Sequence, residues 1–445
     1  MYSHCVMNTH VIFRTWFIRC SAVAALLVPA CTSPLSAQSL LTARLNDVCA
    51  VLNLKSMQFD TVFTAEFLKK VPPMQLTMAT QQLTKESGGC VSIRIVDSTS
   101  AYQCTAEVVT VNGYTIPVTM SIRRNPPHLI EGLFLKPAMR VGSTLASVIK
   151  DLKELKGTTS LSAINLSRKH VLAAHDSSAY MPIGSTFKLY VLGALAEQIR
   201  IGKRRWDDVI VLDTSARSLP SGILQTWPHG SPLTLHTLAT LMISQSDNTA
   251  TDLLMHELHQ DSIERMQSRM GHSNASLNVP FLTTRDVFLL KFTNDGLPAR
   301  EYAGLRPTDR RKFLDRIQEQ TPLASVRFVD TAVVPDRVEW FARTTDCIRA
   351  MDWLRDGRLP PAVLDILSVN EGVEINSKQW PYAGYKGGSE PGVINMTYLL
   401  RHSSGDWYAL SATWMNPDNA SIREHGFSEA TFAGLVQRAI QLLAP

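Results

Sequence analysis

A serine and a lysine three residues apart, at the start of an apolar segment, form the first pattern here that could perform chemistry. The pattern is Ser185-Thr-Phe-Lys188, and the predicted turn Met181-Pro-Ile-Gly184 precedes it. On a helix this spacing brings a hydroxyl and an amine onto one face, and the helix N-terminus favours a nearby anion. The pair therefore fits nucleophilic catalysis. A second copy, Ser147-Val-Ile-Lys150, is interpreted as an ordinary helix face with Ser147 in mid-helix.

Two further motifs place polar side chains next to one another. Ser246-Asp-Asn248 presents a hydroxyl and a carboxamide together, although its residue types also favour a helix N-cap. We expect Asp247 to be structural. In Tyr385-Lys-Gly-Gly-Ser-Glu-Pro-Gly392, the glycines after Lys386 let a substrate approach the strand backbone. The alternative is a charged edge strand followed by a turn.

Together, and in this order, the three motifs resemble the S-x-x-K, S-D-N and K-T-G set of serine β-lactamases and penicillin-binding proteins, over residues 143–445. Leu219-Pro-Ser-Gly, Met242–Asp252 and Pro280–Arg285 sharpen the resemblance. They are similar to β-lactamase-like serine hydrolases related to a protein of clavulanic-acid gene clusters. That group carries a cystatin-like or steroid-isomerase-like domain ahead of the catalytic one.

The resemblance implies catalytic roles for Ser185, Lys188, Ser246 and Lys386. Ser185 would be the acylated nucleophile, and Lys188 would activate it as a partly neutral amine, because burial and the Lys386 charge both lower its pKa. Ser246 would relay a proton to the leaving group. Lys386 would tune Ser246 and attract a substrate carboxylate.

The same resemblance implies a set of binding residues. Asn248 would hold the amide carbonyl of the substrate, and Gly388 and Ser389 would line the substrate path. The backbone N–H groups of Ser185 and Ser389 would form an oxyanion hole. No metal and no cofactor is expected.

Two departures from the family pattern affect the expected activity. Gly387 replaces the threonine of K-T-G and removes a hydroxyl that helps to hold a carboxylate. Residues 271–282, where class A β-lactamases carry a deacylating glutamate, contain no carboxylate. The nearest acids are Glu264 and Asp286, and Asp286 fits a capping arrangement with Thr283. We therefore expect poor deacylation of β-lactams.

The elements around these motifs predict an α+β, multi-domain chain. Amphipathic helices are predicted at 40–53, 60–70 and 74–86, followed by strands from 91 to 135 with a hairpin at Asn112-Gly113. This is a helix-plus-antiparallel-sheet domain of cystatin-like (steroid-isomerase-like) type. A serine β-lactamase/transpeptidase-like α/β domain follows, its sheet built from both of its ends. The predicted elements of this second domain are a helix at 143–156, strands at 160–175, helices at 185–201, 234–243, 247–259 and 284–293, a helical region at 295–375, strands at 382–389, 392–401 and 406–414, and a helix at 428–443.

The amino-terminal residues predict export. Arg14 and Arg19 precede a short apolar run, as in a signal peptide spanning 1–37. Val28-Pro-Ala-Cys31 allows a second interpretation, a lipoprotein leader cleaved before Cys31. The protein would then be periplasmic or an outer-membrane lipoprotein, bound to a membrane only if Cys31 is lipidated. The remaining domains are predicted at 38–137 and 138–445.

The composition excludes one class of binding partner. The 445 residues carry a net charge of +5 that is too mild and too dispersed to indicate nucleic acid. A small molecule is the expected partner: a β-lactam, an ester or a cell-wall peptide. Oligomeric state is left open, as is a disulfide between Cys90 and Cys104.

Three functions are consistent with these motifs. The first is an exported serine hydrolase that acts through an acyl-enzyme on a β-lactam, ester or small amide. The second is a penicillin-binding-type D-alanyl carboxypeptidase. The third is a protein that binds a β-lactam or peptide without turning it over.

Overall fold

The computed structural model describes residues 37–55, 58–136, 138–140, 142–213 and 217–444. The predicted leader, Cys31 included, lies outside these residues except for Ala37, where the first helix begins. Among the residues described, no helix has the length and apolar character needed to cross a bilayer. The chain divides into two compact units. One contains the described residues up to Gln81 with Ser92–Val108 and Val118–Phe134, and the other contains Gln82–Val91, Val109–Pro117 and the chain from Leu135 onward.

The N-terminal part consists of helices followed by a sheet. The strands pair in the order β1-β2-β3-β4, and β5 pairs with β3. Gly113 has φ +74° in the turn between β2 and β3, as the predicted hairpin requires. The elements are α1 (Ala37–Leu52), η1 (Phe59–Thr61), α2 (Ala65–Lys70), α3 (Pro73–Ser87), β1 (Cys90–Ser100), β2 (Gln103–Thr110), β3 (Tyr114–Ile122), β4 (Ile130–Leu135) and β5 (Met139–Arg140).

The structure answers whether Cys90 and Cys104 form a disulfide, which the sequence left open. Cys49 and Cys90 are both disulfide-bonded. Cys104 is buried and free, so no bridge joins it to Cys90.

Strands from both ends of the C-terminal part form one sheet, as predicted. Its order is β12-β13-β14-β6-β7, which makes β12 an edge strand. Strand β14 pairs antiparallel with β6, so that Tyr408 lies opposite Asn165. The strands are β6 (Thr158–Asn165), β7 (His170–His175), β12 (Tyr382–Glu390), β13 (Val393–Arg401) and β14 (Trp407–Met415).

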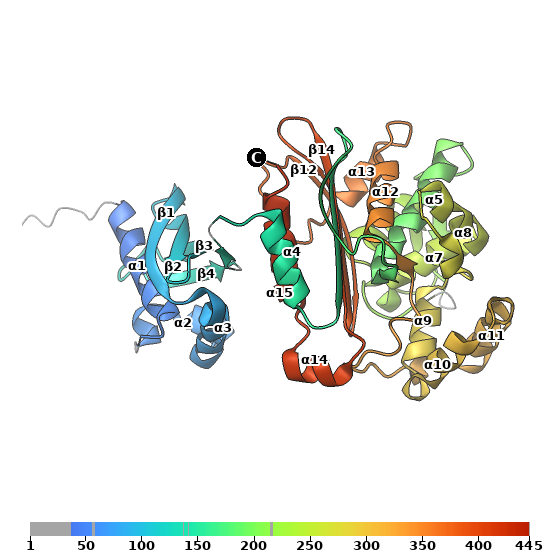
Figure 1. The fold of residues 1–445 in the computed structure, drawn as a ribbon, viewed down its shortest axis with the longest axis horizontal. Coiled ribbons are helices and arrows are strands. Elements are labelled where there is room, and N and C mark those ends of the chain that lie inside the picture. The colour runs from blue at the N-terminus through green and yellow to red at the C-terminus, as the bar shows by residue number, and fades with distance from the viewer. Residues whose placement is uncertain (1–36, 56–57, 137, 141, 214–216, 445) are drawn as a thin grey trace, which may run out of the picture. The chain divides into compact units, whose positions relative to one another are not determined.

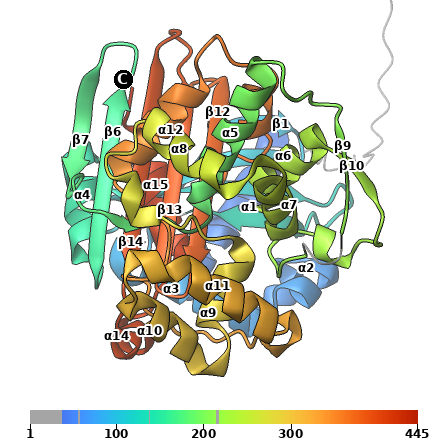
Figure 2. The same cartoon turned by 90° about the vertical axis from the view of Figure 1, so that its right-hand side faces the viewer.

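Helices cover both faces of this sheet (Figure 1). On one face, Val148 of α4 (Leu145–Glu154) and Phe432 of α15 (Glu429–Gln441) are buried in one core with sheet residues. Helices of the middle segment cover the other face (Figure 2). Strand β13 is buried along its length up to Leu400, and its buried polar residues Asn395 and Thr397 are hydrogen-bonded to each other.

The middle segment carries most of the helices. They are α5 (Lys188–Arg200), α6 (Leu235–Ser244), α7 (Asn248–Leu258), α8 (Gln260–Arg269), α9 (Thr284–Lys291), α10 (Leu297–Gly304), α11 (Pro307–Gln320), α12 (Thr344–Leu354) and α13 (Ala362–Leu367), with α14 (Asn419–His425) after the last strand. The short elements are η2 (Gly184–Phe187), η4 (Leu224–Thr226), η5 (Ala275–Asn278), η6 (Asn294–Gly296), η7 (Leu323–Ser325), β8 (Met181–Pro182), β9 (Val209–Val211), β10 (Pro232–Thr234) and β11 (Phe341–Ala342).

Two details differ from the sequence prediction. Helix α8 was not predicted as a separate element; it follows α7 across His259, which has φ +62°. Ser147 does not lie in mid-helix but in the first turn of α4, where it forms a capping box with Thr144. Its hydroxyl donates to the Thr144 carbonyl, so the Ser147 copy of the motif serves the helix end.

Candidate active site

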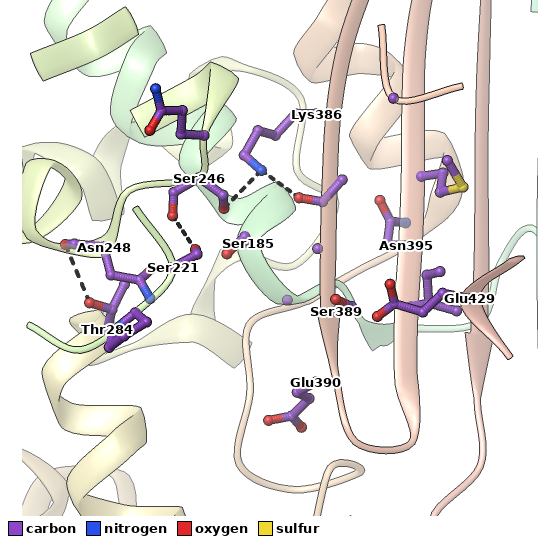
Figure 3. A pocket seen from close by; sticks show the side chains of 18 of the residues that line it. Ser185, Ser221, Ser246, Asn248, Thr284, Lys386, Ser389, Glu390, Asn395 and Glu429 are labelled. Carbon is purple, nitrogen blue, oxygen red and sulfur yellow. Dashed lines mark hydrogen bonds between the residues drawn. The ribbon is translucent and has the colours of Figure 1, made fainter. Parts of the chain in front are cut away.

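A cavity of roughly 710 Å³ lies where the edge strand β12 meets the helical segment. It brings together six of the residues predicted for the site: Ser185, Ser246, Asn248, Lys386, Gly388 and Ser389. Figure 3 shows Ser246 and Lys386 joined by a hydrogen bond beside Ser185. The predicted base, Lys188, does not line this cavity; it is fully buried behind it.

Ser185 sits in the short helix η2, directly ahead of α5, and is partly exposed. Its hydroxyl has no hydrogen-bond partner among the described residues. The strand backbone comes very close to it: a Cβ atom on Gly388 would lie 2.2 Å from the Ser185 nitrogen. A Cβ on Gly184 would likewise lie 3.0 Å from the Ser389 nitrogen. This contact explains the glycine at 388 and brings the two predicted oxyanion-hole segments together.

Lys188 begins α5 and points toward the S-D-N motif. Its Nζ donates to the Ser246 carbonyl at 2.7 Å, to Ser246 Oγ at 3.1 Å and to Asn248 Oδ1 at 2.7 Å. No hydrogen bond joins it to Ser185, although the spacing allows one. Burial, reinforced by the nearby Lys386 charge, holds the pKa of Lys188 well below its ordinary value. Lys188 therefore loses its proton at a lower pH than a solvated lysine does, and the neutral amine that results can accept a proton.

Ser246 receives hydrogen bonds from both lysines. Lys386 Nζ donates to Ser246 Oγ at 3.1 Å and to the Gly387 carbonyl at 2.5 Å. Ser246 has φ +54°, an uncommon value for a serine, and the Ser221 hydroxyl donates to its carbonyl at 2.6 Å. Burial lowers the pKa of Lys386 to about 7. Both amines thus lose their protons at a lower pH than a solvated lysine does.

Asp247 holds this turn and is structural, as predicted. It caps α7 by accepting from the Ala250 N–H. Its second carboxylate oxygen accepts from the backbone N–H groups of Ile223 and Leu224. The cap interpretation therefore holds for Asp247, and the functional interpretation of Ser246 and Asn248 stays a prediction. The neighbouring Asn248 donates one amide proton to the Leu219 carbonyl at 3.1 Å and keeps a second for a ligand.

The capping role expected of Asp286 is also confirmed. Thr283 and Asp286 form a capping box at the start of α9. Glu264 accepts from the Phe281 N–H and pairs with Arg311. Neither carboxylate lines the cavity, and neither does any residue of 271–282.

Three carboxylates that the sequence analysis did not single out line the cavity: Glu339, Glu390 and Glu429. Glu339 and Glu390 both pair with Lys291 at the end of α9, Glu339 at 3.6 Å and Glu390 in closer contact. Burial raises the pKa of Glu390 to about 8, and the neighbouring Glu339 contributes to the rise. Glu390 directly follows the lysine-glycine motif, which is a signal that sequence reasoning could have used. Lys291 and Glu339 carry no such signal.

Trp340 lines the cavity, whereas Trp227 and Trp380 do not. Trp340 stacks on Phe187 with ring centroids 3.7 Å apart, and its indole N–H donates to the Leu282 carbonyl. Within the described ranges, no group of three or more histidine, cysteine or acidic side chains could hold a metal ion.

Part of this chain is similar to known proteins. A family model described as "Beta-lactamase enzyme family" matches residues 142–322. None of the curated proteins matches the chain. Among solved structures, a β-lactamase from Sphaerobacter thermophilus is 21% identical, with 67% of this chain and 96% of that one covered and a TM-score of 0.46. A protein named PBP-A is 16% identical (68% and 97%, TM-score 0.44), and a β-lactamase from Francisella tularensis is 15% identical (67% and 97%, TM-score 0.45).

The matched residues include Ser185, Lys188, Ser246 and Asn248, and Lys386 reaches them from β12. Over residues 142–322, the C-terminal part of this chain is therefore similar to the β-lactamase enzyme family.

Proposed function

We propose that this domain forms an acyl-enzyme at Ser185 and hydrolyses a β-lactam, an ester or a small amide. The observation that carries the proposal is the state of Lys188. It is a buried amine with a lowered pKa, one turn from a free serine hydroxyl and bonded to Ser246 and Asn248. A lysine in this state can take the proton of a nucleophilic serine.

The remaining roles follow from the contacts. Ser246 Oγ touches both amines, so it can pass a proton from Lys188 toward a leaving group. Lys386 supplies positive charge at the same point and can attract a substrate carboxylate. The N–H groups of Ser185 and Ser389 would stabilise the oxyanion, Asn248 would bind an amide carbonyl, and Gly388 lets the substrate lie against the strand.

The nucleophile is tested by comparing two serines that share the same local motif. Ser185→Ala should abolish labelling by a fluorescent penicillin or a fluorophosphonate, because it removes the reacting oxygen. Ser147→Ala is the matched control and should keep the label, since Ser147 serves only as part of a helix cap. Loss of the label in Ser147→Ala alone would refute the assignment.

We further propose that deacylation of β-lactams is slow. The cavity has no carboxylate from 271–282. Of its three carboxylates, Glu339 and Glu390 are engaged by Lys291, and Glu429 lies in the first turn of α15. A missing positioned base commonly costs about 10²–10⁴ in rate. An intact-mass and stopped-flow time course with a cephalosporin should show a burst equal to the enzyme concentration, then slow release. Fast linear hydrolysis with no detectable adduct would contradict this.

The same mass experiment separates the other two candidate functions. A penicillin-binding-type D-alanyl carboxypeptidase shares the three motifs, and the engaged carboxylates are compatible with it. Release of D-alanine from a peptide would favour that function. A permanent adduct, or no adduct, would favour a binding protein without turnover.

We also propose that the protein is exported and that its N-terminal part is a cystatin-like domain bounded near residue 137. Helices α1–α3 ahead of a sheet support the domain type. The disulfide-bonded Cys49 and Cys90 support an oxidising compartment. Cell fractionation of the tagged protein, with a Cys31→Ala variant, tests export and lipidation. Recovery from the cytoplasm would contradict the proposal.

A further inference from the structure

A buried ion cluster adjoins the two backbone segments that are proposed to form the oxyanion hole. It consists of Lys291, the last residue of α9, with Glu339 and Glu390. The Lys291 side chain is fully buried, and those of the two glutamates are 2% and 12% exposed. A buried ion cluster often stabilises a fold no better than apolar side chains of similar size would. Stability alone therefore does not explain why these three residues meet beside the proposed nucleophile.

Glu339 is joined to the segment that carries Ser185. Its carboxylate accepts hydrogen bonds from the backbone N–H of Gly184, directly before Ser185, and from the N–H of Trp340 at 3.0 Å. The Trp340 carbonyl in turn accepts from the Ile183 N–H at 2.9 Å. Two neighbouring residues thus fix the backbone on the N-terminal side of the serine.

Glu390 belongs to the other segment. It follows Ser389 directly at the end of β12, and Lys291 Nζ donates to its carboxylate. The two segments are in close contact, since a Cβ on Gly184 would lie 3.0 Å from the Ser389 nitrogen. One amine therefore connects the residue that follows Ser389 with Glu339, the residue that holds Gly184.

Helix α9 extends this connection to the S-D-N motif. At its start, the backbone N–H groups of Thr284 and Arg285 donate to the Asp252 carboxylate of α7, both at 2.9 Å. Helix α7 itself begins at Asn248 of the motif. Lys291 lies at the other end of α9, which is only eight residues long. A single short helix therefore joins the S-D-N motif to the ion cluster.

We propose that Lys291 is a positioning residue that sets the separation of the Ser185 and Ser389 N–H groups through its contacts with Glu339 and Glu390. An oxyanion hole works only when its donors lie at hydrogen-bonding distance from the place that the oxyanion will occupy. Lys291 does not line the cavity, so it acts through the two backbone segments. This inference rests on the proposed function of the Ser185 site.

The test compares acylation by a neutral p-nitrophenyl ester with acylation by the matching thionoester, in which sulfur replaces the carbonyl oxygen. Sulfur accepts hydrogen bonds weakly, so the ester-to-thionoester rate ratio reports how well the oxyanion hole engages the oxygen. Lys291→Met keeps most of the buried chain and removes the cation. It should slow the ester at least about ten-fold and the thionoester less than about three-fold, because losing one oxyanion donor commonly costs about 10²–10³ in rate.

Arg438→Met is the matched control. Arg438 is another buried cation of the same part of the chain; it joins α15 to Asp151 of α4 and does not line the cavity. Its loss should lower stability without changing the ester-to-thionoester ratio. Thermal melting of both variants ensures that the rates are measured on folded protein.

A neutral version of the cluster separates the effect of position from the effect of unpaired charge. The triple variant Lys291→Met/Glu339→Gln/Glu390→Gln loses the ionic contacts but leaves no carboxylate without a cation, so it should fold even where Lys291→Met alone does not. Its ester-to-thionoester ratio should stay at least about three-fold below that of the unmodified protein, because the two segments are no longer tied by one amine.

A triple variant with the original ratio would overturn the proposal, since unpaired charge alone would then cause the defect. So would an unchanged ratio in folded Lys291→Met, or an equal fall of the ratio in Arg438→Met. Failure of the underlying function is recognised separately, as ester turnover that survives in Ser185→Ala.

Discussion

Replacing Lys386 by methionine should change the pH at which Ser185 becomes reactive. Lys188 and Lys386 each place an amine 3.1 Å from Ser246 Oγ, so the two nitrogens are no more than about 6 Å apart. The Lys386 charge is one of the two causes that lower the pKa of Lys188, second to burial. Methionine keeps most of the buried chain and removes that charge.

The size and sign of the effect follow from Coulomb's law. Two unit charges about 6 Å apart at an effective dielectric constant near 20 repel by about 3 kcal/mol, which corresponds to about two pH units. Repulsion disfavours the ammonium form of Lys188, so removing Lys386 favours that form. The neutral base then appears only at higher pH. The low-pH part of the pH–rate profile, where acylation speeds up as Lys188 loses its proton, should therefore shift to higher pH by as much as about two units.

The assay is the pH dependence of acylation by a neutral p-nitrophenyl ester between pH 5 and 10, which avoids any carboxylate contact. Lys386→Arg is the matched control, because a guanidinium stays charged over this range and should keep the limb at or below its original pH. A Lys386→Met profile reduced in height but with an unshifted midpoint would refute the reasoning. The charge of Lys386 would then not set the state of Lys188.

The other predictions concern stability and close packing. Lys291→Met should lower the free energy of unfolding, measured in urea, by about 3–5 kcal/mol, because it leaves two buried carboxylates without a cation. A triple variant that also carries Glu339→Gln and Glu390→Gln should recover much of that loss. Because burial raises the pKa of Glu390 to about 8, the folded protein keeps a proton that the unfolded chain releases above about pH 4.5. Stability should fall with rising pH across that window, by at most about 1.4 kcal/mol per pH unit, and Glu390→Gln should flatten the slope in thermal melts. Gly388→Ala should slow labelling of Ser185 by about 10² or more, because its Cβ would meet the Ser185 nitrogen at 2.2 Å, whereas Gly304→Ala has open space around it and should label normally.

Local sequence patterns predicted the residues of the candidate site and the sheet. Ser185, Ser246 and Lys386 stand in short motifs whose spacing is itself chemical, and the structure brings them into one cavity. The apolar strands at both ends of the C-terminal part predicted a common sheet, which the pairing of β14 with β6 confirms.

What sequence reasoning missed depends on contacts between distant segments. Lys291, Glu339 and Glu390 become one cluster only through the fold, so each looks like an ordinary surface charge in the sequence. Gly387 was interpreted as the loss of a hydroxyl. Its packing against Tyr385 is a steric relation between two side-chain positions, which spacing alone does not reveal.

The construction of the sheet from both ends of its domain constrains how the protein can be made. Strand β6 cannot gain its β14 neighbour until the ribosome has synthesised residue 415, and the Trp414 indole reaches back 258 residues to the Lys156 carbonyl. Ser185 therefore emerges long before Lys386 can reach Ser246. A nascent or truncated chain holds Ser185, the proposed nucleophile, without Lys386 and without the strand that lies against it. Such late assembly would leave the proposed nucleophile without its partners during synthesis. The pairing of strands that are distant in the sequence, rather than local helix formation, would then limit how fast the site is completed.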